Sequence, residues 1–157
     1  MANYVIGVDD PLAADVRELV SRHLHFARSQ SPPESVFALD ADGLLDPAVT
    51  FYSCRRSGEL LAIGALKHLS DHQGELKSMH TAAAARRLGL GLAMLDHLIG
   101  VARERGYRLL SLETGSMDGF APARALYARA GFTECEAFAS YQPSPHSVFM
   151  SRQLLPG

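Results

Sequence analysis

The first part of the chain places a short β-rich run before a longer stretch of helical periodicity. The run "YVIGV" (residues 4–8) is followed by "DDP", where an aspartate could cap a helix with Pro11 in its first turn. Apolar positions then recur every three or four residues, which predicts a helix from Pro11 to about Arg28, followed by a proline-rich loop, "SQSPPES". The stripe consists of Leu12, Val16, Leu19, Val20, His23 and Ala27.

The middle of the chain reads as three strands in succession. The β-rich runs "AVTFYSCRR" and "ELLAIGALKHL" meet at the short connection "SGE", which predicts an antiparallel hairpin. The polar segment "DHQG" predicts a second turn, and "ELKSMHT" a third strand beyond it.

The last part returns to helical spacing and ends in strands. Apolar residues predict a helix from Gly91 to Arg105, stopped by Gly106, and "YRLLSLET" is a strand. A second helix carries Phe120 and Tyr127 on one stripe, and "FTECEAFASY" and "HSVFMSRQL" are two strands separated by "QPSP". The order β-α-β-β-β-α-β-α-β-β predicts an α/β fold, a mixed sheet with helices on its faces.

Composition narrows the class of protein. The length fits a single domain covering residues 1–157, and 47% hydrophobic with 20% charged residues is typical of a folded chain. A net charge of −2 gives no chain-wide attraction to nucleic acid or an acidic membrane. Without a secretory leader or a long apolar run, we expect a cytoplasmic protein. Cys54 and Cys135 then read as reduced, buried thiols.

One stretch, "ELKSMHTAAAARRLGLGLAML" (residues 75–95), carries the most specific chemistry. A helix that follows a strand and a loop presents unpaired N–H groups and the positive end of its dipole. Gly89 and Gly91 would let an anion approach the backbone, and Arg86 and Arg87 could pair with it. This predicts a pyrophosphate site. It is neither a P-loop, which needs a lysine after the glycines, nor a dinucleotide fingerprint, whose last glycine is Met94 here.

The spacing Arg86-x-x-Gly89-x-Gly91 resembles the acetyl-CoA motif of the GNAT superfamily of N-acetyltransferases. The strand "ELKSMHT" before it and the block "ALYARAGF" (residues 125–132) after it are similar to the same family. The resemblance runs from about Ala48 to the C-terminus and implies a mostly antiparallel central sheet with helices on both faces. It also implies acetyl-CoA as co-substrate, an amine acceptor attacking directly in a ternary complex, and the possibility of a homodimer. Phe120 departs from the family, which often has a cofactor-binding asparagine there.

The resemblance also assigns roles to individual residues. Tyr127 would protonate the departing thiolate, although its place on the apolar stripe also fits a core aromatic. Glu75 would act as general base, unless it is an ordinary surface carboxylate, and Glu113 is the second candidate. The segment near Ser78 would face the acetyl group through its backbone. The residues expected to bind the co-substrate are Met79, His80, Thr81, Arg86, Arg87, Leu88, Gly89, Leu90, Gly91, Leu92, Ala123 and Tyr127.

Two other functions stay open at this point. A non-catalytic acyl-CoA-binding module would keep the basic corner and need neither Glu75 nor Tyr127, and an unrelated phosphate-binding domain is a weaker alternative. The histidines form no ligand set, since His23 and His25 point to different helix faces, so no metal is expected. The acceptor site should be lined by the N-terminal helix, the "SQSPPES" loop and the "YQPSPHS" turn, which name no particular amine.

Overall fold

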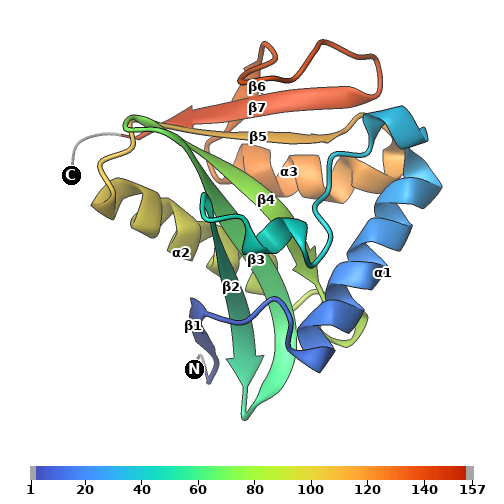
Figure 1. The fold of residues 1–157 in the computed structure, drawn as a ribbon, viewed down its shortest axis with the longest axis vertical. Helices are drawn as coiled ribbons and strands as arrows, with labels where there is room; N and C mark the ends of the chain where they lie inside the picture. Colours follow the sequence, from blue (N-terminus) through green and yellow to red (C-terminus); the bar gives the residue numbers. More distant parts are fainter. Residues whose placement is uncertain (1–2, 155–157) are drawn as a thin grey trace.

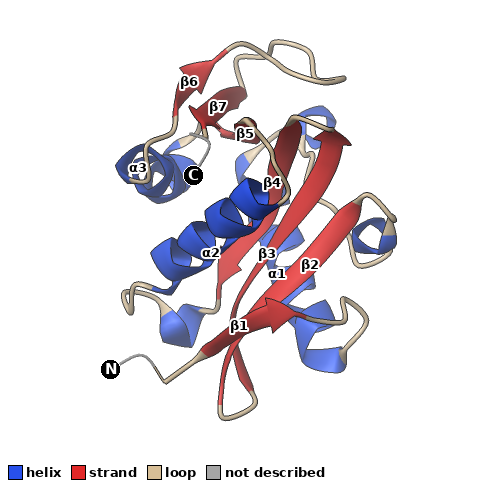
Figure 2. Ribbon diagram, turned by 90° about the vertical axis from the view of Figure 1, so that its left-hand side faces the viewer, coloured by secondary structure: helices blue, strands red, loops and turns tan. Residues whose placement is uncertain are grey.

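The computed structural model describes residues 3–154 as a seven-stranded sheet covered by helices on both faces (Figures 1 and 2). The strand order is β1-β2-β3-β4-β5-β7-β6, and every neighbouring pair is antiparallel except β4 and β5. The predicted order of elements and the mostly antiparallel sheet are therefore confirmed. The bounds are β1 Val5–Val8, α1 Ala14–Gln30, β2 Val49–Arg56, β3 Glu59–Ser70, β4 Gln73–Thr81, α2 Leu90–Glu104, β5 Leu109–Gly115, α3 Ala121–Arg129, β6 Thr133–Cys135 and β7 Ser147–Gln153.

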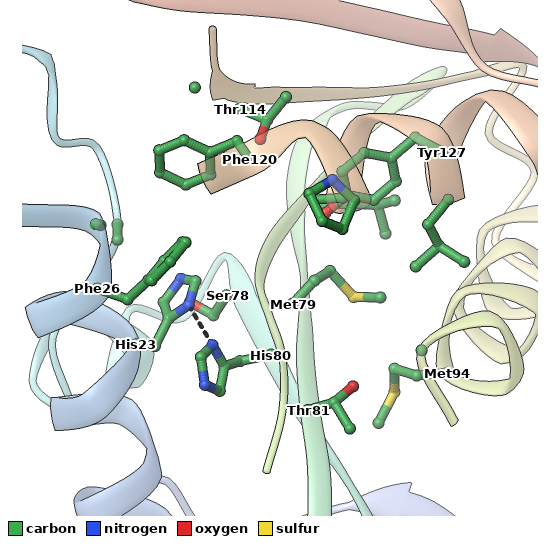
Figure 3. A pocket seen from close by; sticks show the side chains of 18 of the residues that line it. His23, Phe26, Ser78, Met79, His80, Thr81, Met94, Thr114, Phe120 and Tyr127 are labelled. Atoms are coloured by element: carbon green, nitrogen blue, oxygen red, sulfur yellow. Dashed lines mark hydrogen bonds between the residues drawn. The ribbon is translucent and has the colours of Figure 1, made fainter. Parts of the chain in front are cut away.

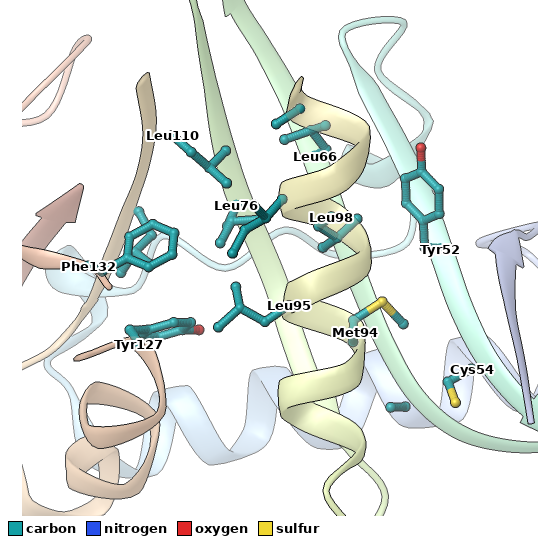
Figure 4. Close-up of a cluster of buried hydrophobic side chains, with 14 of the residues drawn as sticks. Tyr52, Cys54, Leu66, Leu76, Met94, Leu95, Leu98, Leu110, Tyr127 and Phe132 are labelled. Carbon is teal, nitrogen blue, oxygen red and sulfur yellow. The ribbon is translucent and has the colours of Figure 1, made fainter. Parts of the chain in front are cut away.

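Strand β3 lies inside the sheet between β2 and β4, and its apolar residues serve both faces. Ala62 and Leu66 belong to the core shared with α2 and α3 (Figure 4), whereas Ile63 and Ala65 belong to the core under α1. Between them, Gly64 leaves room for neighbouring side chains, since a Cβ there would lie 2.8 Å from the Met79 sulfur. Because Gly64 has no side chain, α2 packs close to the sheet next to β4.

The predicted start of the first helix is wrong by three residues. The turn before it uses Asp10, which accepts the Leu12 N–H through its side chain at 2.9 Å and the Ala13 N–H through its carbonyl at 3.1 Å. The residue before it, Asp9, pairs with Arg55 of β2 at 2.8 Å. The backbone of the "DDP" segment is thus satisfied by a turn, and the helix begins only at Ala14.

The C-terminal hairpin also differs from the prediction. Only Thr133–Cys135 of the expected strand "FTECEAFASY" pairs with β7, and residues 136–146 form a long loop rather than a tight "QPSP" turn. Phe138 and Tyr141 of this loop contact the ring of Phe149 on β7, at centroid distances of 5.9 Å and 5.6 Å. Side-chain packing, rather than hydrogen bonding to a neighbouring strand, therefore holds residues 136–146 in place. Cys54 is buried as expected, but Cys135 is exposed on this edge strand, which corrects its assignment.

Strands β4 and β5 begin side by side and then separate. They pair only from Gln73 with Leu109 to Glu75 with Ser111, although β4 continues to Thr81 and β5 to Gly115. On its other edge β4 contains one extra residue, because the pairing moves from Ala65–Lys77 to Ile63–His80 and Ser78 has φ 57°. A bulge of this kind re-aims side chains, and here it lies at the mouth of the gap between the two strands.

Candidate active site

A cavity of about 820 Å³ occupies the gap between β4 and β5 and extends toward α1 (Figure 3). Its size is typical of small-molecule sites. Figure 3 shows His23, Phe26 and Ser78 on one side of the β4 ribbon, with Tyr127 and Met94 on the other side. The cavity thus has two parts, one against the start of α2 and one against α1.

The phosphate corner, which we define as Arg86, Arg87, Gly89 and Gly91 at the start of α2, has free donors as predicted. Gly89 precedes the helix with φ 77°, which side-chain-bearing residues rarely adopt, and no side chain caps the helix. A Cβ on Gly89 would meet nothing within 4 Å, so this residue leaves open space beside the first N–H groups. Gly91 serves packing instead, since a Cβ there would lie 3.1 Å from Leu126 of α3.

The backbone of β4 offers further donors to the gap. Just after β4, the Ala82 N–H donates to the carbonyl of Leu61 on β3 at 2.8 Å. Because N–H groups alternate in direction along a strand, those of Met79 and Thr81 point away from β3, toward the separated β5. The side chains that follow the bulge point to opposite faces of the sheet. Met79 packs with the α2 core, whereas His80 turns to α1.

Tyr127 comes from the last turn of α3 and lines the cavity from the α2 side. It is 7% exposed and belongs to the same core as Phe132 and Leu95 (Figure 4), so the core reading of this residue is correct as far as its ring is concerned. Burial raises the pKa of its hydroxyl, and the nearby charge of Glu113 adds to the rise. The phenol therefore stays protonated at neutral pH, the state a proton donor requires.

Glu75 is a buried carboxylate, so the surface reading of this residue is wrong. It is 2% exposed, and its Oε2 accepts a hydrogen bond from the Tyr141 hydroxyl at 2.5 Å and pairs with the Lys77 ammonium at 3.3 Å. Lys77 in turn donates to the Tyr141 oxygen at 2.9 Å, which closes a triangle of polar groups. Both donors reach the same oxygen of Glu75, so this carboxylate is already engaged by neighbouring side chains.

Glu113 faces the same cavity from β5, and fewer polar groups compensate for the burial of its carboxylate. The Ser147 hydroxyl donates to its Oε2 at 2.8 Å. Burial raises the pKa of the carboxyl, and this exceeds the opposite effects of the Ser147 hydrogen bond and the Lys77 charge. A carboxylate with a raised pKa is better matched to accepting a proton near neutral pH.

Two histidines meet across the cavity wall, a feature the sequence reasoning missed. His23 of α1 and His80 of β4 share a hydrogen bond between their Nδ1 atoms at 3.0 Å (Figure 3). Burial lowers the pKa of each to about 4, so both are neutral at pH 7. Beside them, the Ser78 hydroxyl is buried without a hydrogen-bond partner. The helical stripe had marked His23 as inward-facing, but nothing local indicated its partner 57 residues away.

Most of the residues predicted for the site do meet at this cavity. All of the expected co-substrate and catalytic residues line it except Leu88, whose side chain is 55% exposed outside the wall. His80 lies toward α1 rather than at the phosphate corner. Of the predicted acceptor segments, the helix and the "SQSPPES" loop line this cavity, whereas the "YQPSPHS" turn lines a smaller neighbouring pocket of about 410 Å³.

The comparison with known proteins agrees with this geometry. A sequence model of the acetyltransferase (GNAT) family matches residues 13–132. The chain belongs to the GNAT family. An N-acetyltransferase of Bacillus subtilis named YsnE, itself uncharacterized, is 48% identical over 95% of this chain and 99% of its own length. The uncharacterized Escherichia coli N-acetyltransferase YedL is 45% identical over 96% of this chain and 95% of its own length.

Solved GNAT structures share the fold. The crystal structure of a Klebsiella pneumoniae protein assigned to the acyl-CoA N-acyltransferases superposes with a TM-score of 0.79 at 31% identity, covering 97% of this chain and 98% of that one. Within residues 3–154 of this GNAT protein, no group of three or more His, Cys, Asp or Glu side chains is placed to hold a metal ion. The helices in that range are also too short or too polar to cross a bilayer.

Proposed function

We propose that the chain, as a single acetyltransferase domain, transfers the acetyl group of acetyl-CoA to a primary amine by direct attack. The observation that carries the proposal is the continuous cavity from the start of α2, past the free N–H groups of β4, to the carboxylate of Glu113. Such a path joins a site for phosphates, a site for a carbonyl oxygen and a proton acceptor, in the order that acyl transfer needs. Acetyl-CoA supplies an acetyl group activated as a thioester.

The phosphate corner would hold the pyrophosphate. The uncapped N-terminus of α2 supplies backbone donors, and Arg86 and Arg87 add positive charge at its edge. Arg129, an exposed residue one turn beyond Leu126 on α3, adds a third cation to this end of the cavity. The fit rests on Gly89, whose conformation leaves the donors uncovered.

The chemical step divides among three groups. The N–H groups of Met79 and Thr81 would stabilise the acetyl oxygen as negative charge develops on it. Glu113 would take the proton that the amine loses as its nitrogen bonds to the acetyl carbon. Tyr127 would give its proton to the sulfur as the carbon–sulfur bond breaks. We place Glu113 ahead of Glu75 as the base because Glu75 is already paired with Lys77 and Tyr141.

The Tyr127→Phe variant tests the assignment of the proton donor, because the ring packs equally well in both proteins. We expect single-turnover acetyl transfer to fall by roughly 10²–10⁴-fold, with little change in acetyl-CoA affinity. Melting temperatures measured first would show whether the fold is intact. A fall of less than about threefold, near 0.6 kcal/mol, would remove Tyr127 from the mechanism. If the wild type binds acetyl-CoA and releases no thiol with any amine, the protein is a binding module.

A further inference from the structure

The part of the cavity that faces α1 differs in chemistry from the phosphate corner. We call it the α1 half and define it by His23, Phe26, Phe37, Ser78, His80, Glu113 and Phe120. Three of these seven residues are phenylalanines, which come from α1, the following loop and the segment before α3. The amine must enter here, because the start of α2 occupies the other end of the cavity.

Two of the rings form one wall. Phe26 and Phe120 meet edge to face at a centroid distance of 5.2 Å (Figure 3). The Phe120 ring packs against Gly115, which leaves room for it, since a Cβ on Gly115 would collide with the ring. Phe120 thus supplies apolar surface facing α1. Flat apolar walls favour a flat apolar partner through edge-to-face and stacked contacts.

The charge of the α1 half comes mainly from Glu113. Four lysine or arginine side chains line the described cavity, and three of them, Arg86, Arg87 and Arg129, lie at the phosphate end. The fourth, Lys77, is already engaged by Glu75 and Tyr141. His23 and His80 are neutral at pH 7 because burial lowers the pKa of both to about 4. None of the residues that define the α1 half is a lysine or an arginine, although the Arg86 charge at the phosphate end also acts on His80. Glu113 is the carboxylate that defines this half and has no salt bridge within residues 3–154, so the α1 half attracts a cation more than a carboxylate.

Ser78 adds a neutral polar contact near the reacting atoms. Its hydroxyl is buried without a partner, and it directly precedes Met79, whose N–H points into the gap. A buried hydroxyl without a hydrogen bond is costly, and an amine nitrogen next to the acetyl group would satisfy it. The amine would thus sit between Ser78 and Glu113, with the body of the acceptor extending to Phe26 and Phe120.

We propose that the acceptor is a primary amine borne on an aromatic ring system through a short linker, with no negative charge beside the amine. This inference rests on the proposed acetyl transfer and names the class of substrate for the same site. Polyamines lack the ring, and amino acids bring a carboxylate for which the α1 half offers no free cation.

The test compares amines that differ in one feature each. Thiol release would be measured at pH 7.5 with 2-phenylethylamine, phenylalanine, n-butylamine, spermidine and an alanine-led tripeptide. We expect 2-phenylethylamine to have a kcat/KM at least about tenfold above each of the others. A higher value for phenylalanine, spermidine, butylamine or the peptide would overturn the proposal.

A variant locates the effect in the α1 half. Phe26→Leu keeps an apolar side chain without the ring, and we expect it to raise the KM for 2-phenylethylamine about threefold to tenfold while leaving those for acetyl-CoA and butylamine unchanged. His25→Asn, an exposed residue on the same helix, is the matched control. If Phe26→Leu shifts both amines equally, the ring does not select the substrate and the proposal is wrong.

Calorimetry separates this inference from the proposed function. The protein would be saturated with CoA and titrated with 2-phenylethylamine and with butylamine. Preferential binding of the aromatic amine without any thiol release would uphold the acceptor class and refute acetyl transfer. Equal binding of the two, or no binding of either, would overturn the acceptor class even if some other amine is acetylated.

Discussion

The phosphate corner and the α1 half are built in opposite ways. The corner lies within the six consecutive residues 86–91, of which 86–89 are exposed, and it presents backbone N–H groups, a left-handed glycine and two arginines. The α1 half consists of side chains from α1, the loop after it, β4, β5 and the segment before α3, held by partly buried hydrogen bonds and ring contacts. A local motif is therefore sufficient for one half of the site, whereas the other half exists only in the assembled fold.

This difference predicts where mutations are costly. In the corner, the proposed binding of the pyrophosphate would be spread over several donors, so we expect one change to weaken affinity and leave the chemistry intact. In the α1 half, single carboxylates and imidazoles carry distinct roles in a buried setting, where electrostatic effects are larger. The four predictions below run from the largest expected effect to the smallest.

Glu113→Gln should give the largest loss, because it removes the proposed proton acceptor without changing its shape. We expect kcat to fall by roughly 10²–10³-fold and the acidic limb of the pH–rate profile to disappear, with acetyl-CoA affinity unchanged. Glu75→Gln is the paired variant and should lose less, since Glu75 mainly holds Lys77 and Tyr141. If Glu75→Gln loses the acidic limb and Glu113→Gln keeps it, the assignment of the base must be reversed.

Acid should destabilise the protein through the His23–His80 pair. The folded state keeps both imidazoles neutral to about pH 4, whereas an unperturbed histidine takes up a proton near pH 6.5. The unfolded state thus binds more protons between these values, and the free energy of unfolding falls as pH drops from 6.5 toward 4, by on the order of 2–3 kcal/mol. Chemical denaturation of His23→Asn across this range should show a shallower fall.

The exposed His25→Asn variant, measured in the same way, should follow the wild type. If the free energy of unfolding of His23→Asn falls with pH as steeply as that of the wild type, the histidine pair does not control acid stability. The α1 half then differs less from the phosphate corner in its dependence on buried side chains.

Arg86→Gln should test the corner with a smaller effect. One charge among several donors is removed, so we expect the acetyl-CoA Kd to rise about tenfold, near 1.4 kcal/mol, with kcat at saturation unchanged. The affinity should also depend less on salt. Calorimetry at two ionic strengths would measure both, and Arg17→Gln, an exposed arginine of α1, controls for the change in net charge. A fall in saturated kcat would mean that the corner also orients the reacting acetyl group.

Glu113→Gln should also change stability slightly, in the direction opposite to activity. Because the folded-state pKa of Glu113 is raised, the carboxyl favours folding when protonated and loses that contribution as pH rises through its raised pKa. At pH 7.5 the amide should therefore increase the free energy of unfolding by roughly 0.5–1 kcal/mol. Below the ordinary value of 4.5 the variant and the wild type should be alike. Equal stability at both pH values would indicate that the carboxylate is well solvated.

The fold was predictable because its signals are local and periodic. The hairpin of β2 and β3, the helix α2 and the order of elements follow from hydrophobic spacing and glycine stops. The boundaries were less accurate where a side chain had a second option. Asp10 closed a turn with Leu12 and Ala13 instead of capping α1, and the loop after Cys135 was fixed by Tyr141 and Phe149 rather than by strand pairing. A single segment of sequence does not show which partner, local or distant, a side chain will contact in the folded protein.

The same division runs through the site. The sequence by itself determined the phosphate corner, because Gly89 and the start of α2 need only consecutive residues to leave N–H groups free. Tertiary structure alone decided that Glu75 is buried and paired, that Glu113 is the less compensated carboxylate, and that His23 meets His80. Proton affinity depends on burial and on neighbouring charge, and both are properties of the folded surroundings rather than of the residue type.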